Sequence, residues 1–234
     1  MSAHSQQSTG CGTLYLIATP IGNLEDITFR ALRMLRQVDL LAAEDTRRTR
    51  RLLDHYDISR ALISYHDHNK QHRSARLLEA LEQGRSVALV SDAGTPGISD
   101  PAFYLVRLAV EHDVPVVPIP GPASPIAALV ASGLPPDRFV FEGFLPVKAG
   151  KRRARLQALA DDPRTIVLFE SPHRMIRTLQ DIRDVLGDRP AAVARELTKK
   201  FEEISRGTVS ELLERYTEKN PRGEMVIVLA GRTV

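Results

Sequence analysis

The segment from residue 87 to residue 101, VALVSDAGTPGISDP, has the composition of a ligand-binding loop between a strand and a helix. Its first four residues, 87–90, form an apolar run that is typical of a buried strand. Gly94 and Gly97 follow with a proline between them, which prevents a regular element and lets the backbone approach a ligand closely. Open α/β sheets bind their ligands in such loops, at the carboxyl ends of the strands.

The helix after this loop has its own start signal. Ser99 and Asp100 can cap a helix that begins at Pro101. The loop contains neither G-x-G-x-x-G nor G-x-x-x-x-G-K-[ST], so it is neither a dinucleotide-binding fingerprint nor a P-loop. A tight turn that binds nothing is the alternative interpretation of this loop taken alone.

Four further segments, each after a predicted strand, carry side chains that can exchange protons or hydrogen-bond a ligand. They are residues 18–26 (ATPIGNLED), 43–47 (AEDTR), 64–69 (SYHDHN) and 120–125 (PGPASP). Because the carboxyl ends of parallel strands meet at one edge of a sheet, we expect all five loops to line one cleft.

The elements that must position these loops alternate regularly in the first half of the chain. We expect strands at residues 14–18, 38–43, 62–65, 87–90 and 116–119, with helices at 27–37, 46–56, 72–82 and 102–111 between them. This order predicts an α/β fold with a mostly parallel five-stranded sheet and helices on both faces.

The second half of the chain has a different pattern. We expect strands at residues 139–142, 165–169, 191–194, 203–207 and 225–230, and helices at 151–160, 172–186 and 209–216. The fourth of these strands follows the third too closely for a helical crossover, which predicts an antiparallel pair in a mixed sheet. Prolines concentrate at 121–136, and a boundary there separates an N-terminal α/β domain, 13–122, from a C-terminal one, 123–234, after a disordered tail, 1–12.

The composition, with 43% hydrophobic and 26% charged residues, is that of an ordinary globular protein. Cys11 is the one cysteine, which excludes a disulfide framework and a cysteine-based metal site and fits a reducing compartment, the cytoplasm. Residues 1–12 lack the apolar core of a signal peptide. The uncharged segment 114–136 contains too many prolines to span a membrane.

Positive charge is distributed unevenly, although the net charge is only +3. Two basic clusters stand out: Arg30, Arg33, Arg36, Arg47, Arg48, Arg50 and Arg51, and then Lys148, Lys151, Arg152, Arg153 and Arg155. Such clusters suit a polyanionic partner such as a phosphate backbone, and a solvated helix face is the alternative for either one.

Several of these segments together resemble one family of enzymes. They are residues 14–23 (LYLIATPIGN), 43–48 (AEDTRR), 65–69 (YHDHN), 91–101 (SDAGTPGISDP), 169–174 (FESPHR), 194–202 (ARELTKKFE) and 223–226 (GEMV). The chain thereby resembles, from about Gly12 to Gly231, the family of ribosomal RNA small subunit methyltransferase I, a branch of the tetrapyrrole (corrin/porphyrin) methylase superfamily.

This resemblance implies two α/β/α domains, a homodimer, and S-adenosylmethionine bound in the cleft between the domains. It also implies 2′-O-methylation of a cytidine ribose in 16S rRNA within the small ribosomal subunit. Many members continue into a helical segment after the last strand, whereas this sequence stops at Val234. We therefore expect a complete methyl-donor site and a reduced affinity for RNA.

The resemblance also assigns the residues that contact the methyl donor, and no metal. In the N-terminal domain and at the boundary these are Pro20, Asp92, Ala93, Gly94, Thr95, Ser124 and Pro125. In the C-terminal domain they are Phe144, Phe169, Glu170, Ala194, Arg195, Leu197 and Met225. Phe169 and Met225 are equally well explained as core residues of their strands.

A ribose hydroxyl is a weak nucleophile until it loses its proton, so the reaction calls for a base or an orienting group. His66 and His68 are candidates because imidazole titrates near neutral pH. Lys199 is a third candidate if burial lowers its pKa, and Glu44 or Asp45 could orient any of them. Candidate RNA contacts are Arg47, Arg48, Arg174, Arg195 and Lys199 for phosphates and Asn23 and Asn69 for the cytosine edge.

Two other functions stay open at this point. One is a methylase of the same fold that acts on a small molecule such as a tetrapyrrole, and the basic clusters argue against it. The other is a non-catalytic RNA-binding module, against which the donor-loop residues argue. Binding of structured rRNA and titration with S-adenosylmethionine distinguish these alternatives.

Overall fold

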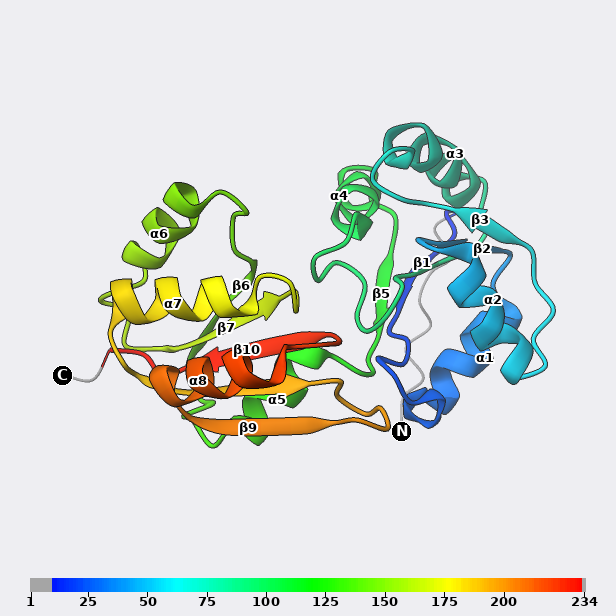
Figure 1. Cartoon of the computed structure of the whole chain (residues 1–234). Coiled ribbons are helices and arrows are strands. Elements are labelled where there is room, and N and C mark those ends of the chain that lie inside the picture. Colours follow the sequence, from blue (N-terminus) through cyan, green and yellow to red (C-terminus); the bar gives the residue numbers. More distant parts are fainter. Residues whose placement is uncertain (1–9, 233–234) are drawn as a thin grey trace, which may run out of the picture. The chain divides into compact units, whose positions relative to one another are not determined.

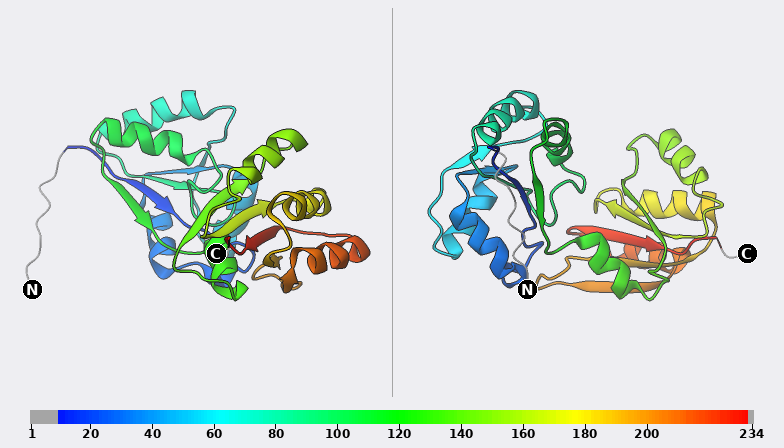
Figure 2. Two further views of the ribbon diagram at one scale, coloured as in Figure 1. Left: turned by 90° about the vertical axis from the view of Figure 1, so that its left-hand side faces the viewer. Right: turned by 180° about the vertical axis from the view of Figure 1, so that it is seen from behind.

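The computed structural model describes residues 10–232. It divides the chain into two compact units, one ending at Pro122 and the other beginning at Ala123. Each unit contains a five-stranded sheet with helices on both faces (Figures 1 and 2). The α/β fold class, with one parallel and one mixed sheet, is therefore confirmed.

The N-terminal unit has a wholly parallel sheet in the order β3-β2-β4-β1-β5. The strands are β1 (Leu14–Ile17), β2 (Leu40–Ala43), β3 (Leu62–Ser64), β4 (Val87–Val90) and β5 (Val116–Ile119). The connecting elements are a 3-10 turn η1 (Leu24–Asp26) and the helices α1 (Phe29–Gln37), α2 (Thr46–His55), α3 (Lys70–Glu82) and α4 (Ala102–Glu111). All five loops at the carboxyl ends consequently leave the sheet at one edge.

Two apolar layers hold this sheet. On one face, α3 and α4 contribute Leu77, Leu81 and Leu105, all 2% exposed or less. On the other face, α1 and α2 contribute Leu35 and Leu53, both fully buried. Burial on both faces explains why the strands are continuous apolar runs without alternation.

The start of the ordered chain differs from the expectation of a disordered tail over residues 1–12, of which residues 1–9 lie outside the described residues. Gly12 is buried and its amide donates to the carbonyl of Leu81 at 2.6 Å. A Cβ on Gly12 would lie 1.9 Å from the carbonyl oxygen of Arg85, so only glycine fits this close approach. The fold therefore begins before β1.

The C-terminal unit has a mixed sheet in the order β6-β7-β10-β8-β9. The strands are β6 (Phe139–Phe144), β7 (Thr165–Glu170), β8 (Pro190–Arg195), β9 (Glu203–Thr208) and β10 (Met225–Leu229). Strand β6 runs parallel to β7, whereas β10 is antiparallel to β7 and β8. The antiparallel pair β8–β9 confirms the prediction made from the short connection between them.

Three helices, α6 (Ala149–Gln157), α7 (Met175–Leu186) and α8 (Val209–Lys219), cover one face of this sheet. The other face is covered by α5 (Ser124–Ser132), through Ala128 and Leu129. This helix, within the proline-rich segment 121–136, is not among those expected from the sequence. Pro125 stands in the first turn, where its missing amide costs nothing, and Gly133 ends the helix with φ +82°.

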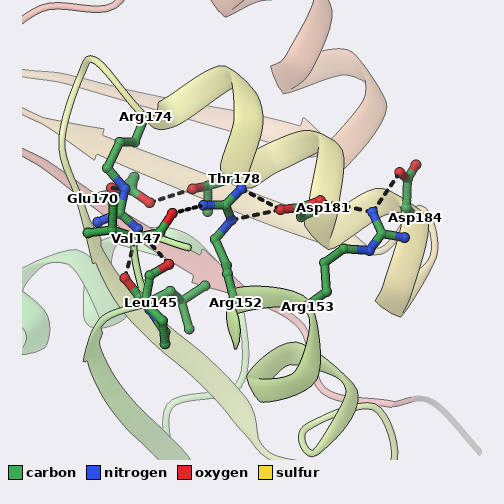
Figure 3. Close-up of polar contacts among 10 residues, drawn as sticks. Leu145, Val147, Arg152, Arg153, Glu170, Arg174, Thr178, Asp181 and Asp184 are labelled. Atoms are coloured by element: carbon green, nitrogen blue, oxygen red, sulfur yellow. Dashed lines mark hydrogen bonds and ion pairs between the residues drawn. The ribbon is translucent and has the colours of Figure 1, made fainter. Parts of the chain in front are cut away.

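The second basic cluster is largely paired with acids of the same unit, contrary to the expectation that it faces a polyanion (Figure 3). Arg152 is 5% exposed, and its guanidinium contacts the Asp181 carboxylate at 2.6 Å. Arg153 contacts Asp181 at 2.9 Å, and Arg155 forms a two-pronged pair with Glu142 at 2.6 Å. These three arginines join α6 to α7 and β6. Of the cluster, Lys148 and Lys151 are exposed and form no ion pair with another described residue.

No helix among residues 10–232 combines the length and apolar character needed to cross a bilayer.

Candidate functional site

The glycine loop after β4 is joined to the loop after β1. Thr19 and Gly94 exchange two backbone hydrogen bonds of 2.9 Å each. Gly94 has φ +81°, and a Cβ there would lie 3.3 Å from the side chain of Ile21. The Thr95 hydroxyl donates to the Pro122 carbonyl at 3.0 Å, which fixes the far side of the turn. The loop therefore has a set shape, in which Gly94 is buried and both of its backbone polar groups are paired with Thr19.

Asp92 joins the same loop to the loop after β2. Its Oδ1 accepts a hydrogen bond of 2.8 Å from the amide of Asp45, and its Oδ2 lies 3.6 Å from the Arg48 guanidinium. Asp45 in turn caps α2 by accepting from the amides of Arg47 and Arg48. The Asp92 side chain is 31% exposed, so it both orders two loops and keeps a face toward solvent.

Glu44 stands next to Asp92, and its Oε2 is 3.5 Å from the Asp92 amide. Burial raises the pKa of the Glu44 carboxyl, and the negative charge of Asp92 raises it further. A carboxyl in this position holds a proton more readily than one in water.

Asp100 organises the end of the glycine loop. Its Oδ2 accepts a hydrogen bond from the Gly97 amide and its Oδ1 one from the Ala102 amide, both at 2.8 Å. The prediction of Asp100 as a cap is confirmed, whereas Ser99 does not cap the helix: its φ is +67° and it is exposed. Burial raises the pKa of Asp100, with those amide hydrogen bonds acting in the opposite direction.

The loop after β3 is held together by Asn69. Its amide group donates to the Ser64 carbonyl and meets Nε2 of His66, each at 3.1 Å, while its oxygen accepts from the His66 amide at 2.9 Å. Both ends of the side chain are thus used inside the loop, and contact of Asn69 with the cytosine edge stays a prediction.

His66 has an unusual environment for a candidate base. Since the Asn69 amide donates to Nε2, the ring proton is assigned to Nδ1, which is buried and has no hydrogen-bond partner among residues 10–232. The geometry therefore presents a hydrogen-bond donor at Nδ1 rather than a free base at Nε2. The exposed His68 packs edge-on against His66 with ring centroids 5.9 Å apart.

Two cavities lie at the edge of the N-terminal sheet where its strands have their carboxyl ends. One, of about 130 Å³, spans the loops after β1, β2 and β4 and is lined by Thr19, Pro20, Leu24, Arg48, Thr49, Arg51, Leu52, Ser91 and Asp92. The other, of about 290 Å³, is lined by Asp67, Lys70, Ser99, Asp100, Pro101, Phe103 and Tyr104. Thr19 and Phe103 were not anticipated from the sequence. Thr19 follows a predicted strand in a loop already singled out, whereas Phe103 lies within the predicted helix 102–111 and is 68% exposed.

The C-terminal unit brings its own predicted donor contacts to one sheet edge. Met225 pairs with both Glu170 and Arg195, and the next pair joins Val226 with Phe169 and Ala194. The rings of Phe144 and Phe169 are 5.4 Å apart, and Phe144 is 56% exposed. Residues far apart in sequence are therefore adjacent here because β10 lies between β7 and β8.

Glu170 and Met225 nevertheless serve the interior of this unit. The Glu170 carboxylate is fully buried and accepts from the Ser171 amide at 2.7 Å and the Thr178 hydroxyl at 2.5 Å (Figure 3). Met225 is 3% exposed and packs in the core beneath α7 and α8. Both residues therefore have a structural role, and their contact with the donor stays a prediction.

Arg174 is likewise engaged within the unit. Its guanidinium lies 3.3 Å from the Glu170 carboxylate and donates to the Leu145 carbonyl at 2.7 Å. The side chain is only 20% exposed, so Arg174 braces the loop before α7, and its contact with RNA phosphates stays a prediction.

Lys199 does not meet the condition set for a base. Burial by itself would lower its pKa, but its hydrogen bonds to Glu224 (2.8 Å) and Glu196 (2.9 Å) outweigh burial and raise the pKa. The ammonium therefore stays charged at neutral pH, and Lys199 fastens the loop between β8 and β9 to the start of β10.

The remaining predicted residues occupy varied positions. Asn23 caps η1 by accepting from the Glu25 amide, and Ala93 lies exposed in the glycine loop. Ser124 and Pro125 form the first turn of α5, Leu197 is partly buried against the core, and Arg47 is exposed on α2. Among residues 10–232 no group of three or more metal-ligating side chains comes together.

A family model and curated relatives place this chain in the same family of proteins. The model of the tetrapyrrole (corrin/porphyrin) methylases matches residues 13–213. Proteins named ribosomal RNA small subunit methyltransferase I are 54% identical in Synechocystis, over 95% of this chain and 80% of that protein, and 50% identical in Escherichia coli O157:H7, over 99% and 82%.

Solved structures agree at the level of the fold. The conserved hypothetical protein APE0931 of Aeropyrum pernix has a TM-score of 0.73 at 18% identity, covering 96% of this chain and 86% of that one. Uroporphyrin-III C-methyltransferase of Thermus thermophilus, complexed with S-adenosylhomocysteine, has a TM-score of 0.65 at 20% identity, covering 94% and 97%. The chain therefore belongs to the tetrapyrrole (corrin/porphyrin) methylase family, in the branch of ribosomal RNA small subunit methyltransferase I.

Proposed function

We propose that this chain transfers a methyl group from S-adenosylmethionine to the 2′-hydroxyl of a cytidine ribose in 16S rRNA. The observation that carries the proposal is identity of about 50% to methyltransferases named for small-subunit rRNA, over nearly the whole chain. S-adenosylmethionine is the methyl donor of this family, and the Thermus relative is complexed with the demethylated product of that donor.

The N-terminal loops fit a donor with a charged amino-acid end and a ribose. Asp92 keeps a carboxylate partly exposed beside the cavity that Pro20 and Ser91 line. His66 adds a buried donor at Nδ1 that needs an acceptor. When bound, the sulfonium supplies an activated methyl group, and the chain's own contribution is to orient the acceptor hydroxyl and exclude water.

Glu44 is the side chain best placed to take the proton of the attacking hydroxyl. Its pKa is raised by burial and by Asp92, and it lies at the carboxyl end of β2 next to the glycine loop. Lys199 is excluded from this role by its raised pKa, and Nε2 of His66 by its bond to Asn69. We therefore assign proton acceptance to Glu44 and hydrogen-bond donation to His66.

The function is tested by methyl transfer from labelled S-adenosylmethionine to three substrates: 30S particles, free 16S rRNA and a short cytidine oligonucleotide. We expect the particle to be the best substrate, because contacts remote from the ribose help to position the hydroxyl. Mapping should find the label on one cytidine 2′-oxygen. Donor binding with no transfer to any RNA, or transfer to a tetrapyrrole, would contradict the proposal.

We also propose a homodimer in the bacterial cytoplasm, as the family resemblance implies. Basic surfaces of two subunits would then face a ribosomal particle that is far larger than one catalytic site. Light scattering at the working concentration measures the oligomeric state, and a monomer that retains full activity on particles would contradict the dimer.

The arginines of α2 should contribute phosphate contacts. Arg47 and Arg51 are exposed, and neither forms an ion pair with another described residue. We expect Arg47→Gln/Arg51→Gln to weaken rRNA binding and to reduce the slope of log K against log salt by about 1 to 2. Arg76→Gln/Arg107→Gln removes the same charge from α3 and α4 and should leave the slope unchanged; equal slopes for both double variants would show that α2 is only a solvated face.

A further inference from the structure

The C-terminal unit contains a cavity whose lining includes Arg195 but none of the other residues expected to contact the methyl donor. It has a volume of about 160 Å³ and lies where the end of β8, the start of β9 and the end of α8 meet. Its lining residues are Arg195, Glu203, Arg215, Tyr216, Lys219, Asn220, Pro221 and Arg222. Four of them are cationic and one is a carboxylate, so the lining carries an excess of three positive charges.

The single carboxylate is already satisfied. Glu203 contacts the Arg195 guanidinium at 3.1 Å and the Arg215 guanidinium at 3.9 Å, and it accepts from the Ser205 hydroxyl at 3.0 Å. Burial would raise the pKa of Glu203, but these partners outweigh burial and lower it, so the charge is present at neutral pH. One carboxylate cannot neutralise the remaining cations of the lining.

Lys219 and Arg222 supply that remaining charge. Neither forms an ion pair with another residue between 10 and 232, and both are exposed at the cavity. Lys219 stands in the last turn of α8, where a cation favours the helix dipole. The dipole does not account for Arg222, which follows the helix after Pro221, or for Arg195, which comes from β8. Cations from separate elements thus converge on one hollow.

The cavity wall between them is neutral. Tyr216 is 3% exposed, and burial raises the pKa of its phenol, so it adds no negative charge at neutral pH. A hollow with planar guanidinium donors, a flexible ammonium and a neutral wall matches a phosphate group, which arginine can grip with two parallel hydrogen bonds.

We propose that this cavity binds a backbone phosphate of the RNA substrate, away from the reacting ribose. The inference rests on the proposed function in that the phosphate belongs to rRNA. It adds a second phosphate contact area, in the C-terminal unit. The arginines of the basic cluster on α6 cannot supply one, because they form ion pairs with acids of the same unit.

The test uses Arg215→Gln/Arg222→Gln. This pair leaves the shorter Arg195–Glu203 contact intact, so the fold should be preserved. We expect rRNA binding at about 0.15 M salt to weaken roughly 5- to 20-fold and the salt slope to fall by about 1 to 2. The affinity for S-adenosylmethionine should be unchanged. The matched control, Lys151→Gln/Arg177→Gln, removes two exposed cations from α6 and α7 and should leave the slope near that of the parent.

Three outcomes would overturn the inference. One is an unchanged salt slope while the parent chain methylates rRNA normally, which leaves the proposed function intact. Another is a loss of S-adenosylmethionine affinity, which would make the cavity part of the donor site. The third comes from titrating the parent and the double variant with inorganic pyrophosphate. If the variant loses pyrophosphate binding while the salt slope of its rRNA binding is unchanged, the cavity is a site for a free anion.

Discussion

Replacing Asp92 with alanine should weaken S-adenosylmethionine binding roughly 5- to 150-fold, equivalent to about 1–3 kcal/mol. The amide of Asp45 loses its acceptor at 2.8 Å, and the loops after β2 and β4 lose the contact that fixes their relative position. The Arg48 contact should contribute little to this loss, because its guanidinium lies 3.6 Å from the Asp92 carboxylate and the Arg48 side chain is 56% exposed to solvent. Calorimetric titration with S-adenosylmethionine measures the effect.

Asp92→Asn serves as the matched control. It keeps an oxygen that can accept from the Asp45 amide but removes the negative charge, so its affinity should lie close to that of the parent. Circular dichroism should give the same spectrum for all three proteins. Unchanged affinity in a folded Asp92→Ala protein would remove this carboxylate from the donor site.

Replacing Asp181 with alanine should lower the free energy of unfolding by about 3–5 kcal/mol, the largest stability effect that we expect. Asp181 is 8% exposed and holds Arg152, which is itself 5% exposed, at 2.6 Å (Figure 3). Without its partner the Arg152 guanidinium is a buried charge, and among the described residues only the Val147 carbonyl, at 3.0 Å, remains to accept a hydrogen bond from it. Urea unfolding followed by circular dichroism measures the change.

Asp184→Ala is the control on the same helix. Asp184 also contacts Arg153, at 3.2 Å, but its side chain is 45% exposed, so its removal should cost no more than about 1 kcal/mol. Arg152→Met/Asp181→Leu removes both buried charges and should recover much of the lost stability. Equal losses for Asp181→Ala and Asp184→Ala would show that burial does not distinguish the two carboxylates.

The sequence by itself determined the strands and helices other than α5, and it located the polar loop segments that follow the strands of the N-terminal unit. Strands β1 to β5 are short apolar runs separated by amphipathic helices, and such local patterns report burial without knowledge of distant partners. The glycine loop at 91–101 was recognisable from its two glycines. The structure gives the reason for them: Gly94 and Gly97 adopt φ values of +81° and +92°, which few other residues tolerate. The family resemblance added the donor and the substrate.

Tertiary structure decided which of the polar residues are available. Arg152 and Glu170 are engaged by Asp181 and Thr178, partners that lie 29 and 8 residues away and become neighbours only when α7 packs on the sheet. Nothing in a basic run distinguishes a solvated arginine from a buried, paired one, because the difference lies in long-range contacts. For the same reason the cationic hollow at Arg195 and Arg222 exists only after β8 and the end of α8 meet.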